Sequence, residues 1–356
     1  MSKSTSVAEI LNLIAAPAFS VCDGMITNCN DGAERLFYQI GTPIADLLLQ
    51  NHSQYLNFTN GCLYVPLRNG QQCYSASVVR TENADIFVIE EEMEQIELKT
   101  LSLTAANMRQ PLSSMIATAS NLNSALAQTD DPKIRAQLQH MNRNLHRMHR
   151  MLCNMSDTLQ YTEGASSNMV CQNVVSVVEN IFQQSQHLCI ESGFHLEYNV
   201  PSEPVLCSID EDLLERAIFN IISNAIKFSE NGSVIRASLF HQDKRVYISV
   251  QDQGCGIPSS ILRNVFQRYQ RQPSLEDARS GLGLGLALVR CAAKVHQGTV
   301  LIDHPENIGT RVTISFPIST SSIAMVRSNI THTDYAGGWD HGLLELSDVM
   351  PPELYS

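Results

Sequence analysis

The feature that most constrains this chain is a heptad pattern of apolar residues, repeated on two consecutive segments. Within each segment the apolar residues recur at alternating steps of four and three, which predicts two helices with a continuous apolar seam. The first seam comprises Leu101, Ala105, Met108, Leu112, Met115, Ala119, Leu122 and Leu126. The second follows Pro132, a residue suited to a first helical turn, and comprises Ile134, Leu138, Met141, Leu145, Met148, Leu152, Met155 and Leu159. A two-helix hairpin cannot bury both seams by itself, so we expect a homodimer, or a heterodimer with a related chain, that forms a four-helix bundle.

Length and charge set the wider frame. The chain has 356 residues, which at roughly 100–200 residues per domain predicts two or three domains. The net charge of −12 disfavours nucleic acid or an anionic membrane as the main partner. The sequence has no evident signal peptide and no run near the ~18 apolar residues that a membrane span needs. The ten cysteines form no CxxC pair, so we expect reduced thiols and a cytoplasmic location.

Residues 8–90 predict a small α+β unit. The β-rich runs "CLYVPL" and "QQCYSASVV" flank Asn69-Gly70, a strong hairpin-turn signal, and "DIFVIE" follows them. This order resembles a PAS sensor domain, and the alternative is a generic small α+β domain without a ligand. The spacing of His52, Cys62 and Cys73 indicates neither haem, flavin nor a metal.

The rest of the chain predicts a helical hairpin, a sheet domain and a tail. The hairpin occupies residues 91–163. In residues 168–317 strands alternate with a long helix from Asp210 and a second helix near Leu284–His296, which predicts a mixed sheet covered by helices on one face. Residues 319–356 are Ser-rich and then acidic, and carry the single tryptophan, Trp339. We expect a flexible tail there, with either a short docking segment or plain disorder. The predicted fold class is multidomain α/β.

The segment "NIISNAIKF" places three polar side chains on one face of a predicted helix. Asn220, Asn224 and Lys227 are spaced i, i+4 and i+7, a spacing that shares a face. The opposite stripe predicts core: Leu214, Ile218, Ile221 and Ile222. Mg²⁺ prefers oxygen ligands and takes only one or two from many proteins, the rest coming from phosphates and water. The segment therefore predicts a site for Mg²⁺ and its phosphates, with a solvated helix face as the alternative.

A second segment, "DQGCGIP", follows a predicted apolar strand. Asp252 ends that strand, where an unpaired buried carboxylate would be costly, and an adenine amino group would give it a partner. Gly254 and Gly256 let the backbone turn tightly beneath a flat ring. By itself, D-x-G-x-G is compatible with any strand-to-loop turn.

Two further segments complete the pattern. In "VFQRYQR", Phe266 could anchor the segment while Arg268, Tyr269 or Arg271 reaches a terminal phosphate, and an ordinary amphipathic helix is the alternative. The segment "GLGLGLALV" opens a helix with glycine amides, which can cradle an anion. Its glycines are Gly281, Gly283 and Gly285. The preceding polar segment "PSLEDARS" could act as a lid.

In this order and with these gaps, the four segments resemble the N, G1, F and G2 boxes of the histidine-kinase ATP-binding domain. That α/β sandwich fold is shared with gyrase, the Hsp90 chaperones and MutL proteins. The resemblance implies ATP and Mg²⁺ as ligands, with Asn224 binding the metal and Asn220 in the catalytic polar position. It also implies that Lys227 meets phosphate and that Asp252 meets the adenine amine. The glycines implied to line the triphosphate are Gly281, Gly283 and Gly285.

The first predicted helix, through "TAANMRQPLSSM", resembles the dimerisation and phosphoacceptor helix of the same family. There the motif is H-[ED]-x-R-x-P-L, and this sequence keeps its later part: Arg109, Pro111 and Leu112. Ala106 stands at the acceptor position and Asn107 at the acidic one. Because Ala106 follows the seam residue Ala105, we expect it to face outward. Alanine has no nucleophile and asparagine takes up no proton, so we expect no ordinary autophosphorylation at position 106.

Three functions then remain open. The chain could phosphorylate a histidine on a partner chain and communicate with a response regulator. It could use an acceptor on its own second helix: His140, His146 or His149. It could also be a pseudokinase, in which ATP closes the lid and shifts the bundle between two packings that a partner reads.

Other enzymes with this ATP fold fit less well. Serine kinases that act on anti-sigma partners usually lack the long heptad hairpin. ATPases of the gyrase and chaperone kind place an acidic general base at the position of Asn220, whose amide cannot accept a proton from water. We therefore expect no fast hydrolysis, while phosphoryl transfer, which depends chiefly on positioning and charge neutralisation, remains open.

Overall fold

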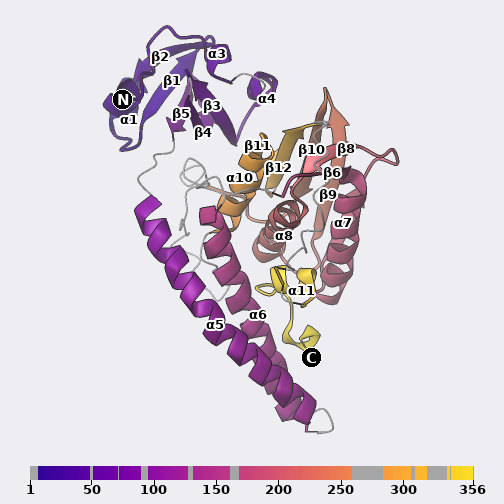
Figure 1. Cartoon of the computed structure of the whole chain (residues 1–356). Helices are drawn as coiled ribbons and strands as arrows, with labels where there is room; N and C mark the ends of the chain where they lie inside the picture. The colour runs from indigo at the N-terminus through magenta and orange to yellow at the C-terminus, as the bar shows by residue number, and fades with distance from the viewer. Residues whose placement is uncertain are drawn as a thin grey trace, which may run out of the picture.

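The structure is a computed structural model, and the parts of the chain that it describes are residues 7–48, 51–70, 72–89, 95–126, 131–160, 168–258, 284–305, 309–318, 335–336 and 338–355. These residues form a small N-terminal domain, a long helical hairpin and a larger C-terminal domain (Figure 1).

The N-terminal domain is a five-stranded antiparallel sheet with short helices. The sheet order is β2-β1-β5-β4-β3, and Gly70 takes a positive φ of 62° at the predicted hairpin turn between β3 and β4. Phe19 and Phe87 stack in the core with ring centroids 4.8 Å apart. The elements are α1 Val7–Asn12, β1 Ala18–Cys22, β2 Met25–Cys29, α2 Asp31–Arg35, α3 Ile44–Leu48, α4 His52–Asn57, β3 Cys62–Asn69, β4 Gln72–Arg80 and β5 Asp85–Ile89.

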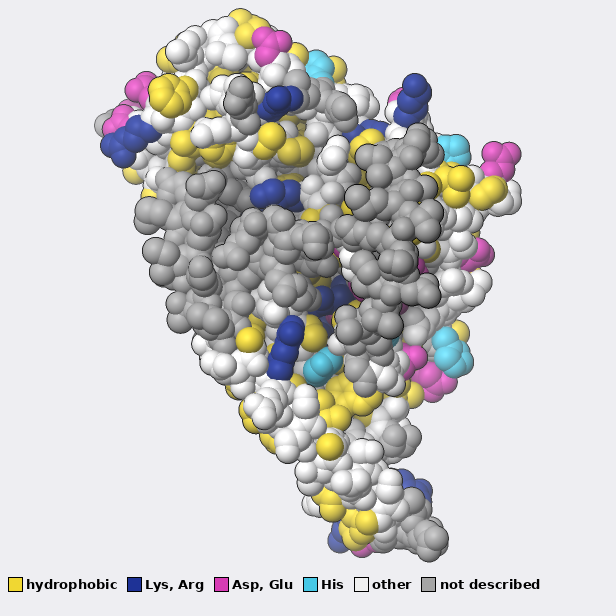
Figure 2. Space-filling view, in the orientation of Figure 1, with side chains coloured by type: hydrophobic (Ala, Val, Ile, Leu, Met, Phe, Trp, Pro, Cys, Tyr) yellow, Lys and Arg dark blue, Asp and Glu magenta, His cyan; other side chains and the backbone are white. Residues whose placement is uncertain are grey.

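The hairpin consists of α5 Gln95–Leu126 and α6 Pro132–Gln160. Five residues of the predicted seam are buried between the two helices: Ala105, Leu112, Ala119, Leu145 and Leu152. Four other seam residues are exposed in the single chain, as is the neighbouring Met151: Met108, Met115, Leu122 and Met148. Figure 2 shows hydrophobic side chains (yellow) along the surface of the hairpin. One hairpin therefore leaves an apolar face uncovered, which is the condition on which the dimer prediction rests.

The C-terminal domain is a mixed sheet with helices on one face (Figure 1). Its strands follow the order β11-β12-β10-β9-β7, in which only the β7–β9 pair is parallel. A two-stranded β6–β8 ladder lies beside it. The elements are β6 Val170–Asn173, α7 Val174–Glu191, β7 His195–Asn199, β8 Leu206–Ile209, α8 Glu211–Phe228, β9 Val234–Gln242, β10 Arg245–Gln251, α10 Gly285–Val295, β11 Thr299–Asp303 and β12 Arg311–Pro317.

The two sheets join edge to edge, a feature that no sequence pattern predicts. Strand β3 of the N-terminal domain pairs antiparallel with β11, matching Val300 with Tyr64 and Ile302 with Cys62. The result is one ten-stranded sheet that spans both domains. Gly61, just before β3, has a φ of 91°, and a Cβ there would lie 1.9 Å from the carbonyl oxygen of Ile302. Only glycine lets the strands approach this closely.

The C-terminal end is folded where the structure describes it, and is not the flexible tail expected above. Helix α11 His341–Glu345 and the 3₁₀ helix η4 Pro352–Leu354 pack against α6. Leu346, Met350 and Tyr355 join the core of the C-terminal domain, whereas Trp339 packs against the core of the hairpin. The docking alternative thus fits residues 335–336 and 338–355, whereas residues 319–334 of the expected tail lie outside the described residues.

Candidate functional site

Helix α8 positions the three polar residues of "NIISNAIKF". It begins after Asp210, whose side chain caps the helix by accepting a hydrogen bond from the Leu213 amide at 3.2 Å. The predicted apolar stripe is buried, with Ile218 and Ile222 fully inaccessible. Asn220 is 3% exposed, whereas Asn224 and Lys227 are partly exposed. The helix therefore holds one buried and two accessible polar groups on its functional face.

The N-terminus of α10 meets α8 at Asn220. A Cβ on Gly285 would lie 3.0 Å from the side-chain oxygen of Asn220, so the glycine allows a close approach that a side chain would crowd. The structure therefore brings together two of the four segments identified in the sequence. Gly281, Gly283, Phe266 and Arg268 lie outside the described residues.

Asp252 follows β10 and is 8% exposed. Its Oδ1 accepts hydrogen bonds from the amides of Gly254 at 2.8 Å and Thr310 at 2.9 Å. Burial raises the pKa of Asp252, although both backbone hydrogen bonds and the nearby His304 lower it. Among the described residues both bonds end on Oδ1, which leaves Oδ2 as the oxygen that a ligand's amino group would meet.

Glycines hold the loop after β10 against the end of α8. A Cβ on Gly254 would lie 2.3 Å from the carbonyl oxygen of Phe228, the last residue of α8. Gly256 has a φ of 70°, a conformation that costs other residues free energy. The carboxylate of Asp252 and the polar face of α8 are therefore fixed in one region by backbone packing.

Three residues beside Asp252 were not predicted from the sequence. The Thr310 amide binds the carboxylate, and a Cβ on Gly309 would lie 2.1 Å from the Asp252 carbonyl oxygen. His304 joins the two loops, with Nδ1 2.7 Å from the Gly309 oxygen and Nε2 3.0 Å from the Ile257 oxygen. The one sequence signal that could have indicated a turn here was the Gly309-Thr310 pair, directly before a predicted strand.

Arg150 on α6 was not predicted either. Its Nη2 donates to Asn220 Oδ1 at 2.9 Å, while Asn220 Nδ2 donates to the Arg216 carbonyl oxygen at 2.8 Å. Both ends of the Asn220 amide are therefore engaged. Arg150 is 5% exposed, although its sequence surroundings suggest an ordinary solvated helix face.

Position 106, where the resemblance puts the acceptor, carries an alanine without a reactive side chain. Ala105 is fully buried and Ala106 and Asn107 are exposed on α5, as the seam predicts. On α6, His140 is exposed, whereas His146 is stacked beneath Trp339 with ring centroids 3.7 Å apart. His149 makes an edge contact with the same indole ring.

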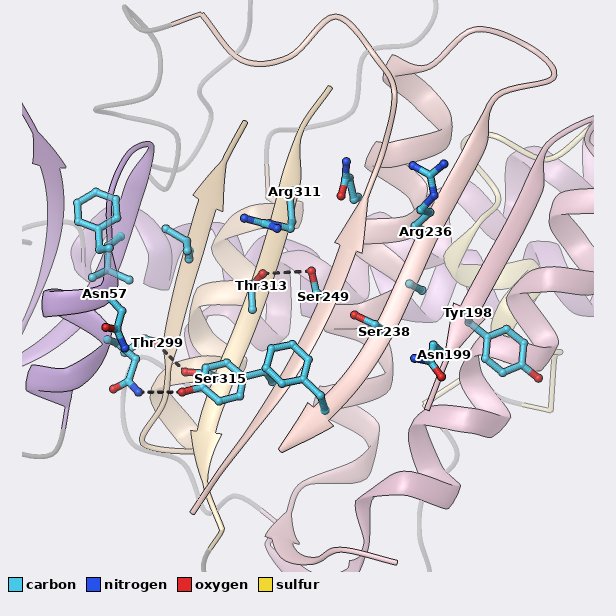
Figure 3. Close-up of a pocket in the computed structure, with 18 of the residues that line it drawn as sticks. Asn57, Tyr198, Asn199, Arg236, Ser238, Ser249, Thr299, Arg311, Thr313 and Ser315 are labelled. Atoms are coloured by element: carbon cyan, nitrogen blue, oxygen red, sulfur yellow. Dashed lines mark hydrogen bonds between the residues drawn. The ribbon is translucent and has the colours of Figure 1, made fainter. Parts of the chain in front are cut away.

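A cavity of about 670 Å³ lies away from these residues, between α4 and the opposite face of the C-terminal sheet (Figure 3). Its wall includes five small hydroxyl side chains beside aromatic and aliphatic ones: Ser238, Ser249, Thr299, Thr313 and Ser315. Its charged side chains are paired, Arg236 with Glu197 and Arg311 with Asp303. The chemistry therefore concentrates around α8 and Asp252 and not in this cavity.

Comparison with known proteins identifies the domain that carries most of these residues. Residues 209–320 match the family described as histidine kinase-, DNA gyrase B- and HSP90-like ATPase. The adaptive-response sensory kinase SasA of Crocosphaera subtropica is 29% identical over 261 residues, which cover 69% of this chain and 67% of that protein. The sensor histidine kinase WalK of Bacillus subtilis is 34% identical over 128 residues, covering 35% of this chain and 21% of WalK.

A solved structure shares the fold. The crystal structure of full-length ShkA in complex with AMPPNP is 19% identical with a TM-score of 0.51, and the match covers 63% of this chain and 46% of ShkA. This chain spans about two thirds of SasA and much less of other relatives, such as 24% of the sensor protein KdpD from Clostridium acetobutylicum. Among the described residues, no helix is both long and apolar enough to cross a membrane.

Proposed function

Because the chain is a histidine-kinase-like protein with an ATP-binding domain of the histidine kinase, gyrase and HSP90 type, we propose that it binds Mg-ATP and transfers the terminal phosphoryl group to a histidine on a partner chain. The observation that carries this proposal is the convergence of Asp252, the polar face of α8 and the glycine-opened start of α10 around one region.

The residues present fit ATP at two points. The Oδ2 atom of Asp252 can accept a hydrogen bond from the adenine amino group, because the backbone bonds that the described residues make to this carboxylate use Oδ1. At the other end, the bare Gly285 at the start of α10 lets phosphate oxygens approach backbone amides. Lys227, in the last turn of α8, supplies a positive charge for the phosphates.

The residues also fit Mg²⁺, which would neutralise phosphate charge when bound. Asn224 presents an amide oxygen on the accessible side of α8. Asn220 could supply a second oxygen only after its bond to Arg150 is broken. Among the described residues no cluster of three acidic, histidine or cysteine side chains competes as a metal site, so phosphates and water would complete the coordination.

We propose a partner as the acceptor because α5 has no histidine to take the phosphoryl group and no acidic residue beside it. In the reaction the bond between the γ-phosphorus and its bridging oxygen breaks, a phosphorus–nitrogen bond forms, ADP leaves and the imidazole loses a proton. Ala106 offers no nitrogen and Asn107 no base. The partner would therefore supply both the acceptor histidine and the group that takes its proton.

A pseudokinase is the second candidate, and a specific observation favours it. Arg150 occupies the oxygen of Asn220, the residue proposed for the catalytic polar position. A chain that stayed in this state would bind the nucleotide without transferring phosphate. Its signal would be the change in packing between hairpin and ATP-binding domain.

We propose that the remaining domains serve input and output. The antiparallel β2-β1-β5-β4-β3 sheet supports residues 8–90 as a PAS-like sensor domain. The exposed methionine face of α5 and α6 supports a dimer, homomeric or with a related chain. A response regulator is the proposed downstream partner.

Incubation with ATP labelled at the γ-phosphate tests the proposal. The chain is mixed with a related kinase chain whose own ATP-binding domain is disabled but whose acceptor histidine is intact. We expect acid-labile label on that partner chain and none on this chain. Removing the partner's histidine should abolish the label, which identifies the acceptor.

The other outcomes separate the alternatives. Acid-labile label on this chain alone, lost in one of the variants His140→Ala, His146→Ala or His149→Ala, would indicate an internal acceptor. Tight nucleotide binding without label on any chain would indicate the pseudokinase. Failure to bind adenine nucleotides at millimolar concentration would contradict both candidate functions.

A further inference from the structure

The last part of the chain fills the junction between α6 and α8. We call residues 335–336 and 338–355 the C-terminal segment; Figure 1 shows its helix α11 between α6 and α8. Trp339 lies flat on His146 of α6, at an interplanar angle of 9°. Leu346 and Met350 are buried in the core of the ATP-binding domain. The segment therefore contacts the hairpin and the ATP-binding domain at the same time.

A fully buried carboxylate of this segment lies between two arginines. Glu345 is 0% exposed, and its oxygens are 3.2 Å from Arg150 Nε and 3.1 Å from Arg216 Nε. A buried carboxylate is stable only when it is paired and hydrogen-bonded. The same ion pair also acts on the arginine, because Glu345 holds the guanidinium of Arg150 in one orientation.

In that orientation Arg150 reaches the proposed active site. Its Nη2 binds Asn220 Oδ1 while its Nε binds Glu345. One guanidinium therefore links the C-terminal segment to the polar face of α8. While the segment is docked, Asn220 cannot offer its oxygen to a metal or a substrate.

A second carboxylate of the segment lies among positive charges. Asp348 Oδ2 is 3.0 Å from Arg150 Nη1, and its Oδ1 is 3.0 Å from Arg147 Nε. Burial would raise the pKa of Asp348, but Arg150, Lys227 and Arg147 together hold it below its usual value. Lys227 is the residue proposed to meet the phosphates of ATP.

We infer that Arg147 and Arg150 form an anion site beside the polar face of α8, which carries Asn220 and Lys227, and that the C-terminal segment is an intramolecular inhibitor whose Asp348 fills this site. The inference rests on the proposed function, since ATP is the competitor. Negative phosphates and the Asp348 carboxylate cannot share the same cations without repulsion. Nucleotide binding therefore releases the segment and frees Asn220 from Arg150.

Trp339 reports the state of the segment without any substitution, because it is the single tryptophan of the chain. Saturating Mg-AMPPNP should shift its emission toward that of a solvent-exposed indole as the ring leaves His146. Adenosine, which carries no phosphate, should bind without this shift. An equal shift with adenosine, or none with Mg-AMPPNP under saturation, overturns the inference.

The matched variants are Asp348→Asn and Glu353→Gln, which each remove one carboxylate from the segment. Glu353 is exposed and makes no ion pair among the described residues. If about one chain in ten is undocked, Asp348→Asn should raise Mg-AMPPNP affinity in calorimetry about tenfold. Glu353→Gln should leave the affinity unchanged. Equal affinity for wild type and a folded Asp348→Asn overturns the inference.

A chain that ends at Asp334 provides an independent arm. Once circular dichroism shows that it is folded, it should bind Mg-AMPPNP more tightly than the full chain. A synthetic peptide of residues 335–356 should reverse the gain, and the same peptide with Asp348→Asn should not. A peptide without effect on a folded, nucleotide-binding truncation contradicts the inference but leaves the proposed function intact. Absence of nucleotide binding in every variant instead contradicts the proposed function.

Discussion

The proposed adenine contact depends on one carboxylate that the fold makes costly to ionise. Asp252 is buried, and burial raises its pKa even though two backbone amides and His304 favour the charged form. Its Oδ1 already holds the Gly254 and Thr310 amides, and the carboxylate can accept one more hydrogen bond from a ligand. The residue is therefore suited both to fixing the two loops and to binding.

Replacing the carboxylate by an amide tests this role. Asp252→Asn should weaken Mg-AMPPNP binding by at least about tenfold, since a hydrogen bond to a charged group contributes about 1.5–3 kcal/mol. Calorimetry on wild type and variant measures the difference. Asp243→Asn, in the exposed turn between β9 and β10, is the matched control and should bind as the wild type does.

The raised pKa of Asp252 also predicts a pH dependence. The ionised carboxylate accepts the adenine amino group more strongly than the protonated carboxyl does, so affinity should fall as the pH drops through the raised pKa, at a pH above the ~3.9 of an ordinary aspartate. In Asp252→Asn this loss should disappear. A wild-type affinity that stays constant until the adenine ring itself protonates would contradict the assignment.

His296 predicts a pH effect on stability. Burial lowers its pKa, although the bond from Nδ1 to the Ala292 oxygen at 2.7 Å and the charge of Asp210 raise it. Nε2 accepts a hydrogen bond from the Asp210 amide at 3.0 Å, which only the neutral ring can do. Below about pH 6.5 the unfolded chain takes up a proton that the folded chain refuses. The free energy of unfolding should then fall by up to about 1.4 kcal/mol per pH unit, down to the lowered pKa.

Urea unfolding between pH 7.5 and 5.5 measures this slope. His296→Gln, which cannot titrate, should be less stable at pH 7.5 but should lose most of the decline below pH 6.5. The exposed His195 of β7 provides the control, and His195→Gln should keep the wild-type slope. An unchanged slope in His296→Gln would assign the acid sensitivity to other groups.

At the scale of elements, local periodicity predicts well and distant pairing does not. The spacing of Asn220, Asn224 and Lys227 and the capping Asp210 define α8 within its own sequence. The bond from Arg150 to Asn220 joins residues 70 positions apart, and no period in the chain encodes it. For the same reason, the sequence did not predict that Thr310 binds Asp252, which is 58 positions away.

The C-terminal segment shows a second reason why sequence patterns do not predict contacts between distant parts of the chain. Its acidic composition predicts solvation, but Glu345 is buried and Asp348 partly buried, because α6 and α8 bring arginines to meet them. A carboxylate's burial depends on partners that the segment itself does not contain. The sequence alone could therefore suggest that the C-terminal segment docks, but could not choose between docking and disorder.

The exposed part of the hairpin seam predicts dimerisation. Met115, which is 52% exposed, lies on the uncovered apolar face of α5, and a charge there would be buried without a partner in a four-helix bundle. Met115→Glu should weaken self-association, or association with a related chain, by at least about tenfold, or 1.4 kcal/mol. Analytical ultracentrifugation across a concentration series measures the shift.

The control for this prediction is Ala117→Glu, on the exposed opposite side of α5. It adds the same charge to the same helix and should leave association unchanged. A wild-type chain that remains monomeric at high concentration, alone and with a related chain, would show that this face has another use.

At the scale of the whole molecule, one sheet connects the N-terminal domain with the proposed nucleotide site. Strand β11 pairs with β3 on one side and with β12 on the other. Directly after β11, His304 contacts the Gly309 and Ile257 oxygens beside Asp252. A displacement of the N-terminal domain would therefore act on the adenine end of the site through a single strand.

Gly61 is the point at which this connection can be broken. Its φ is 91°, and a Cβ added there would lie only 1.9 Å from the Ile302 oxygen, so Gly61→Ala should separate β3 from β11. Gly70→Ala is the matched control: its φ is also positive, at 62°, but a Cβ there meets nothing within 4 Å. Each variant carries the strain of a left-handed residue, about 1–2 kcal/mol.

Hydrogen exchange should show lost protection at residues 300–302 in Gly61→Ala alone. Equal protection in both variants would mean that the two sheets hold together without this pairing.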